Sequence, residues 1–250
     1  MTFWIWLAAP FIGIFLGLFG AGGGMLTVPL LVYGAGLPLK QAIVMSVWIV
    51  GAVSLAAAIQ QRAWRVVRPG LLAFFGAGGI LGGILGAVLG AWIAEWIQQL
   101  LFSLLVFVVA WWTLKIRLDE VQQPPAPCNC MVALMLGTGM GIVTGILGVG
   151  GGFLMVPTLI ALGISHLPTA VAHSLVLITG NAFASGLTYV GQVAVALDLL
   201  IGISLLAGVG SLIGSLLLKR LKVEKLQRGF SVLLVIVGGA MLLDLLFRFF

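Results

Sequence analysis

The sequence predicts an all-α polytopic membrane protein built from two repeated units. Three observations predict this class: an apolar composition, a duplicated glycine motif, and basic residues placed at the ends of apolar runs. Hydrophobic residues make up 62% of the 250 and charged residues 7%, against about 25% charged residues in a soluble domain. Such a chain belongs in a lipid bilayer, where about 20 apolar residues span the hydrocarbon. Because an isolated strand in lipid leaves its backbone unpaired, we expect helices.

The net charge of +6 does not indicate a nucleic-acid partner. The basic residues lie at the ends of apolar runs, where they act as topology signals rather than as a surface patch. No Lys or Arg precedes the first apolar run, so we expect a retained first segment rather than a cleaved signal peptide. The predicted partner is therefore the lipid bilayer and not nucleic acid.

A shift of 128 residues aligns two glycine-rich segments without gaps. Ten of the 17 positions in GIFLGLFGAGGGMLTVP (Gly13–Pro29) are identical to those in GIVTGILGVGGGFLMVP (Gly141–Pro157). Such internal similarity indicates a duplicated unit. We predict a first repeat over residues 1–114, a polar, Pro-rich linker over 115–130, and a second repeat over 131–250.

Each repeat contains four apolar segments. They run near residues 3–34, 41–61, 70–94 and 96–114 in the first repeat, and near 131–163, 169–189, 197–218 and 228–247 in the second. The third segments carry glycines at every fourth position: Gly82, Gly86 and Gly90, and Gly210 and Gly214. This spacing places small residues on one helix face and predicts close helix packing.

The basic loops change place between the repeats. In the first repeat Arg62, Arg65 and Arg68 follow the second segment, whereas in the second repeat the basic residues follow the third segment, over 219–228. If cations stay on the cytoplasmic side, the two repeats are inverted, which requires an odd number of crossings in each. Each repeat has an odd number of crossings if its long first segment is broken or re-entrant at the glycine cluster.

Inside a membrane, a glycine cluster can interrupt a helix at a substrate site. Exposed N–H groups and the positive end of the following half-helix bind anions without a formal positive charge. We expect six glycines to contact the substrate: Gly22, Gly23, Gly24, Gly150, Gly151 and Gly152. The alternative is that these glycines only allow helices to cross closely. A nucleotide loop is disfavoured because residues 30–60 contain no acidic residue.

Polar side chains within the second segments are candidate substrate contacts, because they are costly in lipid. The candidates are Ser46, His173, Ser174 and Asn181. His173 can carry a proton between pH 5 and 8, or it can be a neutral imidazole bonded to a carbonyl. No catalytic residue, metal site or cofactor is expected, since Cys128 and Cys130 alone do not build a zinc site. Two alternatives stay open for this pair: free thiols in a loop, or a metal or sulfur contact at a pore mouth.

The segments GLFGAGGGMLTVPLL and GILGVGGGFLMVPTLI, each followed by a helix with a polar start (QAIVMS, TAVAHS), resemble the sulfite exporter TauE/SafE family of membrane anion permeases. The similarity covers nearly the whole chain. It implies a secondary transporter in the bacterial inner membrane, for sulfite, thiosulfate, sulfonates of the sulfoacetate type or small organic acids, with proton coupling by analogy. His173 departs from the family pattern, since a small or hydroxyl residue is more usual there, and so does the cysteine pair in the linker.

The leading hypothesis is a transporter that works by alternating access around the two glycine breaks, and not an enzyme. Three alternatives remain: a membrane scaffold or assembly factor that transports nothing, a membrane enzyme acting on a sulfur compound, and an anion channel.

Overall fold

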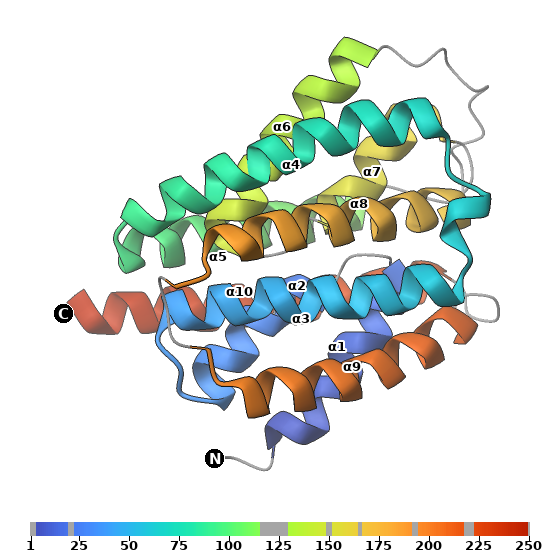
Figure 1. Ribbon diagram of the computed structural model, residues 1–250. Helices are drawn as coiled ribbons and strands as arrows, with labels where there is room; N and C mark the ends of the chain where they lie inside the picture. The colour runs from blue at the N-terminus through green and yellow to red at the C-terminus, as the bar shows by residue number, and fades with distance from the viewer. Residues whose placement is uncertain are drawn as a thin grey trace.

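The computed structural model of the chain describes residues 4–19, 23–115, 130–148, 152–164, 167–191, 195–217 and 223–249 (Figure 1). These residues are almost entirely helical and include no strand. The helices are α1 (Trp4–Phe19), α2 (Gly23–Pro29), α3 (Leu39–Gln60), α4 (Pro69–Trp92), α5 (Glu95–Lys115), α6 (Cys130–Leu147), α7 (Gly152–Ala161), α8 (Leu167–Thr188), α9 (Leu197–Leu217) and α10 (Val223–Phe249), with two short turns, η1 (Leu30–Gly34) and η2 (Ala63–Arg65).

Among the described residues, six helices are long and apolar enough to cross a bilayer: α3, α4, α5, α6, α8 and α9. Shorter apolar stretches lie in α1, in α2 with η1, and in α10. The prediction of an all-α polytopic membrane protein is therefore confirmed. The first predicted segment of each repeat contains two helices, α1 with α2 and α6 with α7. Residues 20–22 and 149–151 lie outside the described part of the chain, so the break at the glycine clusters stays a prediction.

Helices α3 and α8 form the centre of the bundle. They are the most buried of the spans, with 72% and 67% of their apolar stretches inside the protein. The two helices run antiparallel (Figure 1), because Trp48 faces Gly186 while Gly51, further along α3, faces the earlier residue Ala182. The ring of Trp48 also packs edge-on against Phe183, with 5.8 Å between the ring centroids.

Two glycine seams, defined here as the α4–α6 and α1–α9 interfaces, hold the outer helices in place. A Cβ on Gly82 of α4 would overlap the carbonyl of Thr138 in α6, and one on Gly210 of α9 would overlap the carbonyl of Pro10 in α1. Only glycine allows the backbones to approach this closely. The predicted packing role of these glycines is confirmed, and each seam joins the first half of the chain to the second.

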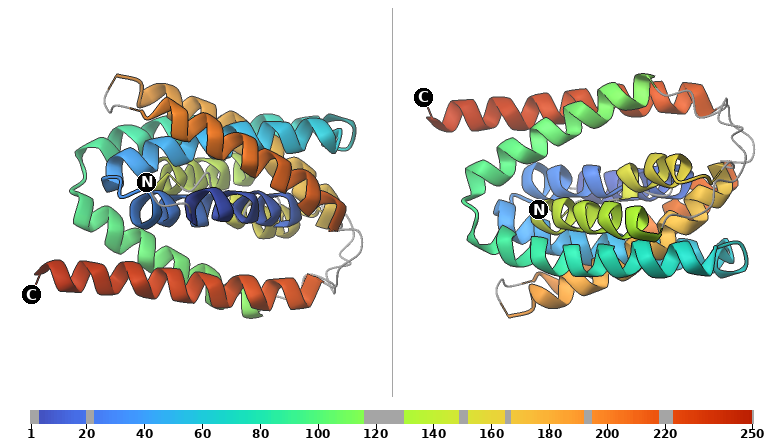
Figure 2. Two further views of the ribbon diagram at one scale, coloured as in Figure 1. Left: turned by 90° about the horizontal axis from the view of Figure 1, so that it is seen from below. Right: turned by 90° about the horizontal axis from the view of Figure 1, so that it is seen from above.

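Helices α5 and α10 lie together along one side of the bundle (Figure 2). The polar end of this pair is held by Gln99, whose Nε2 donates to the Met241 carbonyl at 2.9 Å and to the Asp244 carboxylate at 3.0 Å. The hydroxyl of Tyr33 in η1 donates to the same carboxylate at 3.4 Å. The hydrogen bonds therefore connect α5 and α10 to the rest of the bundle through η1.

Gly82→Ala should lower the free energy of unfolding by about 1–3 kcal/mol, because the added methyl group pushes α4 away from Thr138. Gly139→Ala is the matched control in the facing helix, since a Cβ there meets nothing within 4 Å. Alanine at this position should be neutral or stabilise by up to about 1 kcal/mol. Thermal unfolding of both variants in one detergent measures the difference. An equal loss of stability in the two variants would contradict the packing role of Gly82 in the seam.

Candidate functional site

The predicted glycine contacts begin the two short helices. Gly23 and Gly152 are the first residues of α2 and α7, and Gly24 follows in the first turn of α2, where it is buried. Helix α2 packs against α3, and α7 packs against α8. The clusters therefore lie beside the helices that carry the predicted polar contacts. Three of the predicted glycines lie outside the described residues: Gly22, Gly150 and Gly151.

Ser46 connects α3 to the glycine-rich segment of the second half. Its hydroxyl donates a hydrogen bond of 2.9 Å to the carbonyl of Gly148, and both residues are buried. Gly148 directly follows the last residue of α6 and has a φ of 67°, in the left-handed region that favours glycine. A Cβ there would also lie 2.6 Å from the side chain of Ile43. The structure thus brings Ser46 next to the residues that lead into the second cluster.

His173 is fully buried on α8, and both of its ring nitrogens face backbone groups. Its Nε2 accepts a hydrogen bond from the N–H of Arg68 at 2.8 Å, and its Nδ1 lies 2.8 Å from the carbonyl of Thr169. One accepting and one donating nitrogen describe the neutral tautomer. The Arg68 N–H belongs to the start of α4, where N–H groups lack partners within the helix. The geometry supports the neutral alternative and gives His173 a bracing role between α8 and α4.

Asn181 is the predicted residue with the clearest capacity to bind a ligand. It is 2% exposed, and among the described residues neither its amide oxygen nor its amide nitrogen has a hydrogen-bond partner. The amide faces α4, where a Cβ on Gly79 would lie 2.6 Å from the amide nitrogen. Each unpaired buried group costs about 1–3 kcal/mol. Ser174, in contrast, donates to the carbonyl of Val171 in its own helix.

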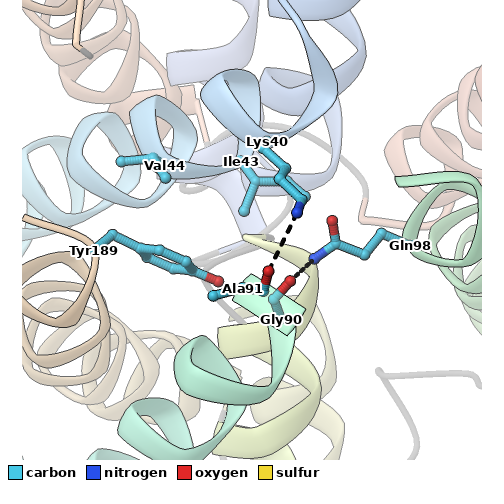
Figure 3. A pocket seen from close by; sticks show the side chains of 7 residues that line it. All are labelled: Lys40, Ile43, Val44, Gly90, Ala91, Gln98 and Tyr189. Atoms are coloured by element: carbon cyan, nitrogen blue, oxygen red, sulfur yellow. Dashed lines mark hydrogen bonds between the residues drawn. The ribbon is translucent and has the colours of Figure 1, made fainter. Parts of the chain in front are cut away.

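A polar cavity of about 120 Å³, which we call the Lys40 pocket, lies at the start of α3 (Figure 3). Four elements meet there: α3, the end of α4, the first turn of α5 and the end of α8. The lining residues are Lys40, Ile43, Val44, Gly90, Ala91, Gln98 and Tyr189.

Lys40 supplies the positive charge of this pocket. Its half-buried Nζ donates a 3.2 Å hydrogen bond to the carbonyl of Ala91 near the end of α4, where carbonyls lack partners within the helix. An ammonium has three donors, and the carbonyl uses one of them. An anion beside a half-buried ammonium is attracted more strongly than in bulk water.

Gln98 and Tyr189 form the inner wall of the pocket, at 2% and 4% exposure. The Nε2 of Gln98 donates to the carbonyls of Gly90 and Ile146, at 2.9 and 3.1 Å, while its buried Oε1 has no partner among the described residues. The Tyr189 hydroxyl donates to the Gly145 carbonyl at 2.9 Å. Burial raises the pKa of Tyr189 to about 12, so the phenol stays protonated. The donors open to an anion are therefore those of the Lys40 ammonium, whereas the Oε1 of Gln98 would accept only from a protonated oxygen.

The family model described as sulfite exporter TauE/SafE matches residues 5–241 of the chain. The chain belongs to the TauE/SafE family. This match confirms the resemblance seen in the two glycine-rich segments, and it covers every residue of the Lys40 pocket. No curated protein and no solved structure matches the chain.

Sequence reasoning missed three residues of this TauE/SafE protein: Lys40, Gln98 and Tyr189. It named none of them as a candidate contact and expected an anion to be held without a formal positive charge, which stays a prediction. The structure directs the ammonium of Lys40 toward the carbonyl of Ala91 near the end of α4. The available signals were an isolated lysine one residue before a span and a glutamine one turn into the fourth segment.

Metal-binding groups do not gather in the part of the chain that the structure describes. There, no group of three or more His, Cys, Asp or Glu side chains is placed to hold a metal ion. Cys130 is exposed at the start of α6, whereas Cys128 lies outside the described residues. The two alternatives for the cysteine pair therefore stay as the sequence left them.

His173→Ala should lower the free energy of unfolding by about 1–3 kcal/mol, because it leaves the Arg68 N–H without its acceptor. His173→Gln offers a carboxamide oxygen to the Arg68 N–H and should recover part of the loss. Thr179→Ala is the control on the same helix, since Thr179 bonds only a carbonyl one turn back. Thermal unfolding measures the difference. A loss of stability in His173→Ala no larger than that in Thr179→Ala would refute the bracing role of His173.

Proposed function

We propose that this protein is a secondary transporter that carries small anions across the bacterial cytoplasmic membrane by alternating access. The substrate class is sulfur oxyanions and sulfonates (sulfite, thiosulfate or the sulfoacetate type) or small organic acids. The Lys40 pocket is the observation that carries this proposal within the TauE/SafE family. Its volume of about 120 Å³ equals about four liquid water molecules, which suits an anion of few atoms.

The transport unit would consist of two inverted repeats, residues 1–114 and 131–250, joined by the linker 115–130. Support comes from three helix pairs that begin 128 residues apart: α3 and α8, α4 and α9, and α5 and α10. Helices α3 and α8 run antiparallel, as inverted repeats require. In addition, Ser215 near the end of α9 donates to the side chain of Gln60 at the end of α3, so the basic connections after these helices start at the same end of the bundle.

The glycine seams suggest which helices would move together. They join α1 to α9 and α4 to α6, so each tight pair contains one helix from each repeat. Packed cores move as discrete units rather than deform continuously. The rocking units would therefore be these mixed pairs, moving against the central α3–α8 pair, rather than one whole repeat against the other.

The substrate path would run along α3 and α8, from the Lys40 pocket past Ser46 toward Asn181. The N–H groups of Gly22–Gly24 and Gly150–Gly152 would act as donors beside this path, with Ser174 on the adjoining face of α8. His173 would contribute by holding the start of α4 in place rather than by carrying a proton.

Lys40→Met should weaken anion binding by about 10- to 100-fold, because a hydrogen bond to a charged group contributes about 1.5–3 kcal/mol. Arg65→Met is the control, since it removes one exposed charge at the other end of the bundle and should bind like the wild type. Thermal shifts with sulfite and thiosulfate, together with saturable uptake into proteoliposomes, measure the effect. Wild-type protein that neither binds nor transports these anions or short carboxylates would refute the function; unchanged binding by Lys40→Met would refute only the role of Lys40.

Asn181→Leu should separate binding from stability, because it removes two unpaired polar atoms with little change in volume. The ligand-free protein should be as stable as the wild type or more so, whereas stabilisation by saturating anion should fall. Ser46→Ala is the contrasting variant: it breaks the bond to Gly148 and should cost about 1 kcal/mol without ligand. If both variants destabilise the ligand-free protein equally, Asn181 is structural.

A further inference from the structure

A second polar cavity lies at the opposite end of the α3–α8 pair. It has a volume of about 490 Å³, and we call it the Arg62 pocket. It forms where α3 ends, α8 begins and α9 ends. The lining residues are Gln60, Gln61, Arg62, Val66, Pro168, Thr169, Ala172, Ser215 and Leu216.

The two pockets occupy equivalent places in the two halves of the chain. Three pairs of lining residues are 128 positions apart: Lys40 and Pro168, Val44 and Ala172, and Gln61 and Tyr189. Because α3 and α8 are antiparallel, pockets at equivalent positions of the two helices lie at opposite ends of the α3–α8 pair. A helix of 22 residues is about 33 Å long, close to the roughly 30 Å of hydrocarbon in a bilayer.

The Arg62 pocket has its own cation and an open donor. The Nε2 of Gln61 is buried and has no partner in the part of the chain that the structure describes, and a buried N–H donor of this kind suits an anionic oxygen. The neighbouring residue, Arg62, adopts a φ of 48°, a left-handed conformation that is costly for a residue with a side chain and that clusters at functional sites. The hydroxyl of Ser215 donates to the Oε1 of Gln60 at 3.1 Å, so α9 fixes the amide of Gln60 at the rim.

We propose that the Arg62 pocket is a second binding site for the same small anion and is the cytoplasmic mouth of the transport path, with the Lys40 pocket as the outer mouth. This inference rests on the proposed function. Arg62, Arg65 and Arg68 follow α3 at this end, and such basic connections stay in the cytoplasm. The Arg62 pocket is also the larger of the two, at about 490 against 120 Å³.

Accessibility of two equivalent positions tests the assignment. Val44→Cys and Ala172→Cys place one thiol in each pocket, in a parent protein with Cys128→Ser and Cys130→Ser. Leu55→Cys is the control, since Leu55 lies on an exposed face of α3, more than one turn before the last residue of the helix. A membrane-impermeant thiosulfonate is added to one side of oriented vesicles at a time, with and without sulfite or the anion that the parent transports best.

The thiol at position 172 should react only from the cytoplasmic side and the thiol at position 44 only from the outer side, while the control reacts from neither. Anion at about ten times its Kd should slow both reactions about tenfold, because about nine sites in ten are then occupied. Reaction of both thiols from one side, no reaction at one of them, or no protection of position 172 by an anion that the parent transports would overturn the second site. Absence of anion flux by both parent and wild type would instead refute the proposed function.

Discussion

Close backbone packing at the two glycine seams is the constraint on which the rest of the structure depends. In lipid, apolar side chains gain little by leaving one apolar surface for another, so helix pairs depend on the fit of small residues. Along the α4–α6 seam both helices contribute glycines that contact the backbone of the other helix. Gly82 faces the backbone of Thr138, and Gly141 faces the backbone of Gly79. The α1–α9 seam is built in the same way, so the two halves of the chain are interleaved and not simply placed side by side.

The seams also determine the shape of both pockets. Helices α4 and α9 are held by helices of the other half, and their ends supply walls at the two ends of the α3–α8 pair. The carbonyl of Ala91 reaches Lys40 at one end, and Ser215 reaches Gln60 at the other. A slip of one helical turn along a seam, about 5.4 Å, would break either contact. The polar groups at the pockets therefore depend on apolar packing deep in the bundle.

The sequence was sufficient for features that depend on composition and local spacing. Helical spans, the 128-residue shift and the glycine faces of α4 and α9 all belong to this kind. Contacts between distant segments were not predictable in this way. In the sequence, Lys40 is only a residue at the edge of a membrane span. The direction of its ammonium depends on where the end of α4 lies, which the structure shows. His173 likewise had two alternatives until the N–H of Arg68, 105 residues away, was seen to donate to it.

The two halves supply equivalent positions to the two pockets, but only the first half supplies their charge. The position of Lys40 is taken in the second half by Pro168, and the position of Arg62 is taken by Val190. Positive charge therefore lies at both ends of α3 and at neither of the equivalent positions of α8. Between these ends the described path offers neutral groups such as the amide of Asn181. An anion would be attracted at each mouth and held only by dipoles in between, which satisfies the requirement that binding be strong enough for entry and weak enough for release.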